Sequence, residues 1–252
     1  INEEMSKPMK IHSSLHTIAL FTSFFIIASC TEEAPVQEPV VNEPTTEVAA
    51  SVESTDAVAS EVKFVEGTHY TKLESPLAST GNVTVTEFFW YACPHCFHFE
   101  SHIQGWVDHK PENVHFEQIP AVFSQRWLLL AKAHYVAKAL KVEDMMSPIL
   151  FREIHEKKRQ VQTLPQLVTI FVENGVTEAE FMLEYEKLAE GGAHFADIER
   201  AIKLGQQFKL NGVPAVVVNG EYLVSNENAG SLENIIAITQ FLVEKTQKAS
   251  SK

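Results

Sequence analysis

Cys93 and Cys96 are the residues of this sequence whose type and spacing point most directly to chemistry. A C-x-x-C pair can form a redox-active disulfide, or it can supply half of a metal site. The whole chain of 252 residues contains three cysteines, which are too few for a framework of structural disulfides. Thiol–disulfide exchange and metal binding are therefore the two chemistries that the pair suggests.

The surroundings of the pair predict different roles for its two sulfurs. Residues 83–91 are β-branched and aromatic, which is typical of a buried strand, and the residues after the pair have the pattern of a helix. At ~100° per residue, Cys96 shares the buried face of that helix with Phe99 and Ile103. Cys93 lies at the helix N-terminus, where free N–H groups and the helix dipole favour a thiolate. We therefore predict an exposed nucleophile, Cys93, and a shielded resolving thiol, Cys96.

Two histidines near the pair raise the alternative of a zinc site. His98 and His102, with the two cysteines, have the residue types of a zinc ligand set. On the helical wheel, however, both histidines fall on the face opposite Cys96, so that one ion could not bind all four. The sequence has no second C-x-x-C pair. We therefore predict a redox centre, with neither a metal nor another cofactor.

Three further residues around the pair are candidates for a catalytic role. His95 can stabilise the thiolate of Cys93, which would make the disulfide a stronger oxidant; the alternative is a spacer without an energetic role. Pro94 suits the first helical turn, where no N–H is needed. Glu87 is expected to be at least partly buried on the strand and to relay the proton of Cys96; the alternative is a solvated glutamate.

The order of predicted elements indicates an α/β fold. Strands are predicted at 83–91, 114–119, 215–219 and 222–225. About 80 residues of helical pattern separate the second strand from the third, with a capping box at Thr177 and Glu180. Gly220 and Glu221 predict a hairpin-like turn between the last two strands, and an amphipathic helix follows the last strand. This order predicts one sheet with an inserted helical subdomain. The predicted boundaries are 63–123 and 206–248 for the domain that contains the sheet, and 124–205 for the insert.

The first thirty residues have the features of a secretory signal. An apolar run at 18–28 follows two lysines and is too short to span a bilayer comfortably. Residues 27–30, which end in Cys30, resemble the lipobox of bacterial lipoproteins. The pattern predicts a signal peptide at 1–29 and a lipid on Cys30. The alternative is an ordinary signal peptide with an incidental cysteine.

An acidic segment follows the predicted lipidation site. Between positions 31 and 62 there are eight acidic residues and no lysine or arginine, and few large apolar side chains. We expect residues 30–62 to be a disordered tether, because such a segment cannot bury enough surface to order itself. The segment is also too polar and too short to form a dimerisation domain, so we predict a monomer. The net charge of −13 argues against nucleic acid as a partner.

Two stretches of the sequence resemble the DsbA family of periplasmic dithiol oxidases, residues 87–100 around the cysteines and residues 212–222. The resemblance extends from about residue 65 to residue 246. It implies a thioredoxin-like fold in which Cys93 is the nucleophile, Cys96 the resolving thiol, His95 the tuning residue and Glu87 the buried acid. It also implies that Val213 and Pro214 form a cis peptide beside the dithiol and contact client proteins.

The resemblance further implies partners and a location. The expected activity is the donation of disulfides to reduced secreted client proteins, followed by reoxidation by a quinone-linked membrane protein. The expected location is the periplasm, on a bacterial membrane to which the lipid on Cys30 anchors the chain. Two other functions stay open: a disulfide isomerase or reductase, and a thioredoxin-like binding module without enzymatic activity.

Overall fold

The structure is a computed structural model that describes residues 64–77 and 81–250. The predicted signal peptide, the predicted tether and Cys30 lie outside the described residues. Within these ranges no helix combines the length and the apolar character needed to cross a membrane.

A five-stranded mixed sheet forms the centre of the described chain, with the strand order β1-β5-β4-β2-β3. The strands are β1 (Thr71–Lys72), β2 (Val83–Phe89), β3 (Val114–Pro120), β4 (Ala215–Val218) and β5 (Tyr222–Ser225). Strand β2 is parallel to β3 and antiparallel to β4. The four strands predicted from the sequence are confirmed, and the two-residue β1 was not predicted.

A tight turn joins β4 to β5. Asn219 and Gly220 both have positive φ, 54° and 60°, and the N–H of Glu221 donates to the carbonyl of Val218 at 3.0 Å. Positive φ at both central residues is the mark of a type I′ turn, whose twist matches that of antiparallel strands. The hairpin predicted from the sequence is therefore confirmed, with Asn219 and Gly220 rather than Gly220 and Glu221 as its central residues.

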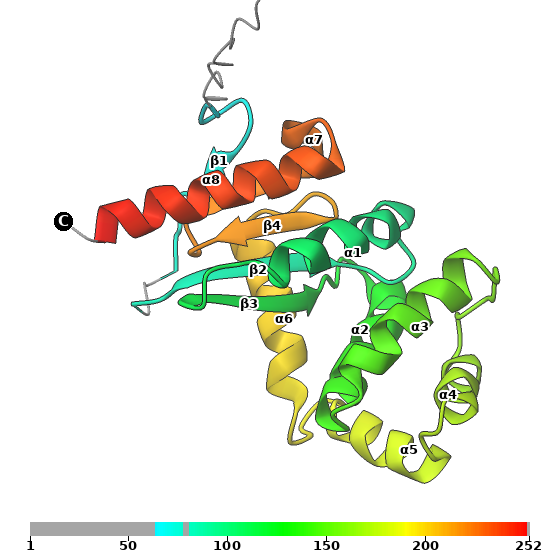
Figure 1. The fold of residues 1–252 in the computed structure, drawn as a ribbon. Helices are drawn as coiled ribbons and strands as arrows, with labels where there is room; N and C mark the ends of the chain where they lie inside the picture. Colours follow the sequence, from blue (N-terminus) through cyan, green and yellow to red (C-terminus); the bar gives the residue numbers. More distant parts are fainter. Residues whose placement is uncertain (1–63, 78–80, 251–252) are drawn as a thin grey trace, which may run out of the picture. The chain divides into compact units, whose positions relative to one another are not determined.

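Helices cover both faces of the sheet (Figure 1). The helices are α1 (Pro94–Val107), α2 (Gln125–Ala139), α3 (Glu143–His155), α4 (Leu164–Glu173), α5 (Glu178–Lys187), α6 (Phe195–Gln207), α7 (Asn226–Ala229) and α8 (Leu232–Ser250). On one face, Phe99 and Ile103 of α1 pack with Ile238 of α8 in a single apolar cluster. On the other face, Leu204 of α6 packs with Phe88 of β2. Both layers remove apolar surface from water, which is the main favourable contribution to folding.

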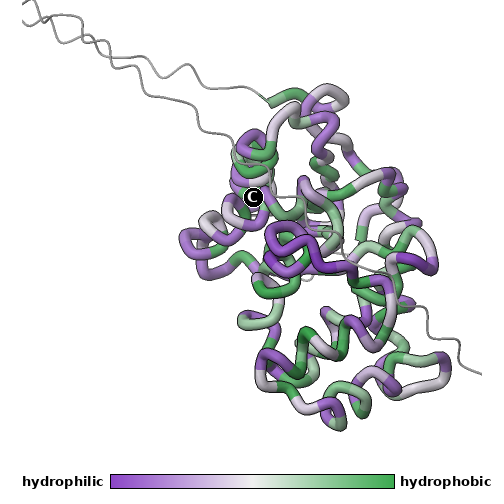
Figure 2. Tube along the Cα trace, turned by 90° about the vertical axis from the view of Figure 1, so that its right-hand side faces the viewer, coloured by the Kyte–Doolittle hydropathy of each residue, from purple (hydrophilic) through white to green (hydrophobic). Residues whose placement is uncertain are grey.

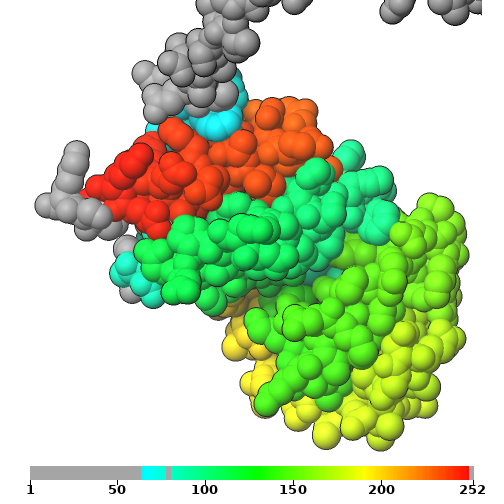
Figure 3. Space-filling view, in the orientation of Figure 1, coloured from blue at the N-terminus to red at the C-terminus, as the bar shows by residue number. Residues whose placement is uncertain are grey.

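The helices α2 to α5 gather at one end of the described part of the chain and form the predicted helical insert (Figures 1 and 3). They share a buried cluster that includes Leu150, Phe171 and Phe181. The capping box predicted at Thr177 and Glu180 is confirmed, since the Glu180 N–H donates to the Thr177 hydroxyl at 3.2 Å. Hydrophilic and hydrophobic residues alternate along the chain (Figure 2). In α4, the buried residues Leu167, Ile170 and Phe171 recur at the spacing of one helix face.

The position of α6 bears on the predicted domain boundary at residue 205. This boundary falls within α6, whose Ala201 and Leu204 pack against the sheet. The helix thus connects the insert to the sheet, and the exact division of the chain into 124–205 and its flanks stays a prediction.

Candidate active site

The two cysteines lie where β2 leads into α1, and both are free thiols. Cys93 is the N-cap residue of α1 in an extended conformation, with φ −89° and ψ 119°, and is half-buried. Pro94 takes the first helical position, as predicted. Cys96, one turn further along, has 0% exposure and packs in the same cluster as Phe89. The predicted difference in exposure between the two sulfurs is therefore confirmed.

The surroundings of Cys93 favour its thiolate. A hydrogen bond from the Cys96 thiol is the largest cause that lowers the pKa of Cys93 to about 6. Hydrogen bonds from the backbone N–H groups of Cys96 and His95 and the charge of His95 act in the same direction, whereas partial burial acts against them. The unpaired N–H groups of a helix start thus stabilise the sulfur anion.

The surroundings of Cys96 have the opposite effect. Burial is the largest cause that raises the pKa of the Cys96 thiol well above its usual value, and the hydrogen bond and charge of Cys93 add to it. The nearby carboxyl of Glu87 raises this pKa further. At neutral pH, Cys93 is therefore mainly a thiolate while Cys96 keeps its proton.

The loop before β4 approaches the dithiol from far along the sequence. The peptide bond between Val213 and Pro214 is cis, in agreement with the expectation from the resemblance. The Cys93 thiol lies 3.5 Å from the carbonyl oxygen of Val213, to which it can donate. The structure therefore brings together the cysteine pair and residues 213–214, which the sequence separates by 120 positions.

Glu87 is fully buried on β2, on the side of the sheet that α1 covers. Its carboxylate accepts a hydrogen bond of 2.8 Å from Gln118, which lies opposite it in the register of β2 and β3. Burial is the largest cause that raises the pKa of Glu87 to about 8, and the charge of Glu100 adds to it. One of its oxygens, Oε1, is buried without a hydrogen-bond partner among the described residues. The prediction that Glu87 is buried is confirmed.

The sequence reasoning missed two members of this group, Glu100 and Gln118. Gln118 also donates to Glu100, at 3.4 Å, and burial raises the pKa of the Glu100 carboxyl. We call Glu87, Glu100 and Gln118 the carboxylate cluster. The helical wheel carried a signal for Glu100, because this residue falls on the same face as Cys96 and Ile103. No comparable signal pointed to Gln118, whose position depends on the strand register.

The histidines of α1 lie at the surface, apart from the buried sulfur. His95 and His98 are exposed, and His102 lies 3.6 Å from the carboxylate of Glu233 on α8. Because Cys96 is buried and His98 is exposed, the two cannot bind one metal ion together. Among the described residues no group of three or more potential ligands is placed to hold a metal.

A second polar group under the same turn also escaped the sequence reasoning. The Tyr91 hydroxyl lies 2.6 Å from the Ser147 hydroxyl and 3.4 Å from Nδ1 of His134, and all three residues are buried. We call these residues the tyrosine cluster. His155 of α3 contacts the backbone carbonyl of Tyr91 through Nε2 at 2.8 Å. These contacts connect the helical insert to the segment that precedes Cys93.

The sequence matches a known domain family and named relatives. Residues 84–237 match the family of DSBA-like thioredoxin domains. The thiol:disulfide interchange protein DsbA of Pseudomonas aeruginosa is 31% identical over 191 residues, which are 75% of this chain and 89% of that protein. The protein of the same name from Azotobacter vinelandii is 30% identical over 185 residues, which are 73% of this chain and 85% of the relative.

Solved structures agree with this match. The crystal structure of Pseudomonas aeruginosa DsbA is similar with a TM-score of 0.70 and 30% identity, over 75% of this chain and 97% of that chain. The oxidoreductase DsbA from Xylella fastidiosa has a TM-score of 0.65 and 27% identity, over 71% of this chain and 96% of that chain. Fold and matches together define a thioredoxin-like thiol:disulfide oxidoreductase, which confirms the predicted fold class. The chain belongs to the family of DSBA-like thioredoxin domains.

Proposed function

We propose that this enzyme donates disulfides to reduced secreted client proteins through Cys93 and Cys96. The observation that carries the proposal is a half-exposed thiol with its pKa lowered to about 6, one helical turn from a buried thiol. A stable thiolate stabilises the reduced form of the pair, and a pair whose reduced form is stable oxidises other dithiols readily. The pair therefore suits an oxidase better than a reductase.

The reaction begins from the oxidised pair. A client thiolate attacks the Sγ of Cys93, the bond between Cys93 and Cys96 breaks, and a mixed disulfide forms. Cys96 leaves as a thiolate and takes up a proton. A second client thiolate then attacks the client sulfur of the mixed disulfide and expels Cys93 as a thiolate. In total, two electrons pass from the client to the enzyme, and the client loses two protons. The enzyme gains one proton, on Cys96, and the other proton goes to the solvent.

Neighbouring residues support these steps. Glu87, with its raised pKa, is the proton donor for the departing Cys96 sulfur. His95 helps to stabilise the Cys93 thiolate through its charge, and Pro94 starts the helix that presents this thiolate. Val213 and Pro214 receive the client, whose extended chain pairs with the main chain next to Cys93.

The proposal includes a location and a second partner. A lipid on Cys30 anchors the enzyme to a membrane surface in the periplasm, and residues 30–62 form the tether. A flexible chain of this length spans on the order of 30 Å. After each cycle a quinone-linked membrane protein takes two electrons from the reduced pair. The pattern at residues 27–30 supports the anchor, and the naming of the relatives as thiol:disulfide interchange proteins supports the exchange with other proteins.

The equilibrium of the pair with glutathione redox buffers tests the oxidase function. We expect the pair to stay reduced until the buffer becomes strongly oxidising, because the Cys93 thiolate stabilises the reduced form. A pair that stays oxidised down to reducing buffers would support a reductase. A pair that does not exchange with glutathione would support a binding module without enzymatic activity.

The variant Cys30→Ala tests the anchor. Loss of the lipid should move the protein from the membrane fraction to the soluble fraction of cells, without a change in the redox potential of Cys93 and Cys96. Equal membrane association of the variant and the wild type would show that Cys30 is incidental to a signal peptide.

A further inference from the structure

A groove lies directly beside the segment that leads to Cys93. It has a volume of about 730 Å³, in the range of ligand-binding pockets. Trp90 and Ala92 line it on the side of the active-site turn, Arg126 and Leu129 on the side of α2, and Lys158 and Arg159 in the segment after α3. The groove thus runs from the active-site turn to the helical insert.

The side chains that line the groove have charge of one sign. Arg126, Lys158 and Arg159 contribute cations, and no aspartate or glutamate of the described ranges lines the groove. The chain as a whole has 33 acidic and 20 basic residues, so a cationic surface runs against its average composition. The groove therefore attracts negative charge.

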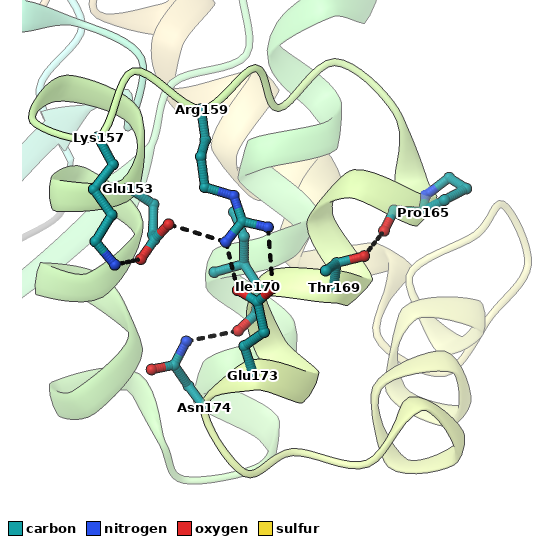
Figure 4. A network of polar contacts seen from close by, with 8 residues as sticks. All are labelled: Glu153, Lys157, Arg159, Pro165, Thr169, Ile170, Glu173 and Asn174. Carbon is teal, nitrogen blue, oxygen red and sulfur yellow. Dashed lines mark hydrogen bonds and ion pairs between the residues drawn. The ribbon is translucent and has the colours of Figure 1, made fainter.

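Two of the three cations are available to a ligand. Arg159 forms ion pairs with Glu153 and Glu173, and this network continues to Lys157 (Figure 4). Arg126 and Lys158 are exposed, and neither forms an ion pair with a described residue. Their charges are consequently not neutralised within the folded part of the chain.

The groove begins one residue from the reacting sulfur. Ala92 precedes Cys93 in the chain, and consecutive Cα atoms are about 3.8 Å apart. Trp90, which lines the groove, stacks on Trp127 with ring centroids 4.1 Å apart and an interplanar angle of 11°. This stacking fixes the position of an apolar side chain on one side of the groove. A client cysteine bonded to Cys93 is therefore attached next to a residue that lines the groove.

We propose that this groove selects clients with acidic residues next to the reactive cysteine, whose carboxylates pair with Arg126 and Lys158. This inference rests on the proposed oxidase function and specifies its substrate class. Exposed charges of this kind act mainly on the rate of encounter, and their effect decreases as salt screens them.

Three peptides that differ only in charge test the inference on the full-length oxidised protein. Each contains the same pair of cysteines, flanked by glutamate, glutamine or lysine residues. At low ionic strength we expect the second-order rate constant of oxidation to be about tenfold higher for the glutamate peptide than for the lysine peptide. The difference should decrease with added salt. Equal rate constants for the three peptides would overturn the inference.

A charge-matched pair of variants locates the effect. The double variant Arg126→Gln/Lys158→Gln should lose most of the preference for the glutamate peptide and keep the rate of the glutamine peptide. The control Lys203→Gln/Lys248→Gln removes the same charge from exposed positions on α6 and α8 outside the groove, and it should keep the preference. Equal loss in both variants would assign the preference to net charge and overturn the inference.

A binding measurement separates this inference from the proposed function. Failure to oxidise any of the peptides would refute the oxidase function. The proposed binding of acidic peptides to the groove is then tested with a glutamate peptide that has serines in place of cysteines. Binding of this peptide should change the fluorescence of Trp90 and Trp127. Binding that weakens at least tenfold in the Arg126→Gln/Lys158→Gln variant supports the groove, and binding that is absent or unchanged refutes it.

Discussion

Cys93 and Cys96 are one helical turn apart, yet the two regions around them act on a thiol in opposite ways. At the exposed start of α1, a thiol hydrogen bond and backbone N–H groups lower the pKa of Cys93 to about 6. In the interior beneath α1, burial and the charges of Cys93 and Glu87 raise the pKa of Cys96. The comparison shows that the start of one helix can provide both environments. Its first turn has free N–H groups that favour a thiolate, and the residue one turn later is buried, which favours the protonated thiol.

The interior region itself contains two kinds of polar group. The carboxylate cluster holds two acids at a place where burial penalises their charge. The tyrosine cluster consists of groups that meet at the Tyr91 hydroxyl, and burial keeps His134 neutral by lowering its pKa to about 3. Nε2 of His134 has no hydrogen-bond partner among the described residues. The first cluster can exchange protons near neutral pH, whereas the second contributes hydrogen bonds alone.

Removal of either sulfur gives the largest expected effect. Cys93→Ala should abolish the reaction with clients, because the sulfur that forms the mixed disulfide is absent. In Cys96→Ala, the Cys93 thiolate should attack a client disulfide, break its S–S bond and form a mixed disulfide that no second enzyme thiol resolves, so that mixed disulfides accumulate. Gel electrophoresis without reductant measures both outcomes. If the two variants trap clients equally, the assignment of an exposed and a shielded sulfur is wrong.

Replacement of Glu87 should change how stability depends on pH. The folded protein holds the proton of Glu87 up to a pH of about 8, whereas the unfolded chain loses it near pH 4.5. Between these values stability should therefore fall as pH rises, by up to about 1.4 kcal/mol per pH unit. In Glu87→Gln this contribution should vanish, which denaturant unfolding at several pH values measures. The control Glu112→Gln, at an exposed site, should keep the slope.

Loss of the Tyr91 hydroxyl should affect stability but not redox chemistry. Tyr91→Phe leaves the buried Ser147 hydroxyl without its partner, at a cost of about 1–3 kcal/mol in the free energy of unfolding. The glutathione equilibrium should not change, because this hydroxyl is not among the groups that shift the pKa of Cys93. Tyr185→Phe serves as the control, with an expected change below about 0.5 kcal/mol. A shifted glutathione equilibrium in Tyr91→Phe would show that the tyrosine cluster tunes the dithiol.

The smallest expected effect is that of His95. Its charge is the smallest of the effects that lower the pKa of Cys93, so His95→Gln should raise this pKa by less than about one pH unit. Absorbance of the thiolate as a function of pH measures the wild-type midpoint, expected at about 6, and its change in the variant. A wild-type midpoint at or above 8 would contradict an activated nucleophile, and an unchanged midpoint in His95→Gln would leave His95 as a spacer.

The sequence by itself determined those features that depend on neighbours within one helix, strand or turn. The burial of Cys96, the helix start at Pro94 and the burial of Glu87 follow from the periodicity of one element or the chemistry of one helix end. The hairpin at Gly220 and the capping box at Thr177 follow from local turn and cap chemistry. These predictions are confirmed because the interactions that produce them lie within a few residues of one another.

The tertiary structure decided which elements meet at the site. Periodicity shows which side of an element is buried, but it does not show which other element covers that side. The contact of Gln118 with Glu87 depends on the register of β2 and β3, and the contact of His155 with Tyr91 depends on how the insert folds back. The groove between α2 and the segment after α3 arises in the same way, because packing brings together charges that are distant in the sequence.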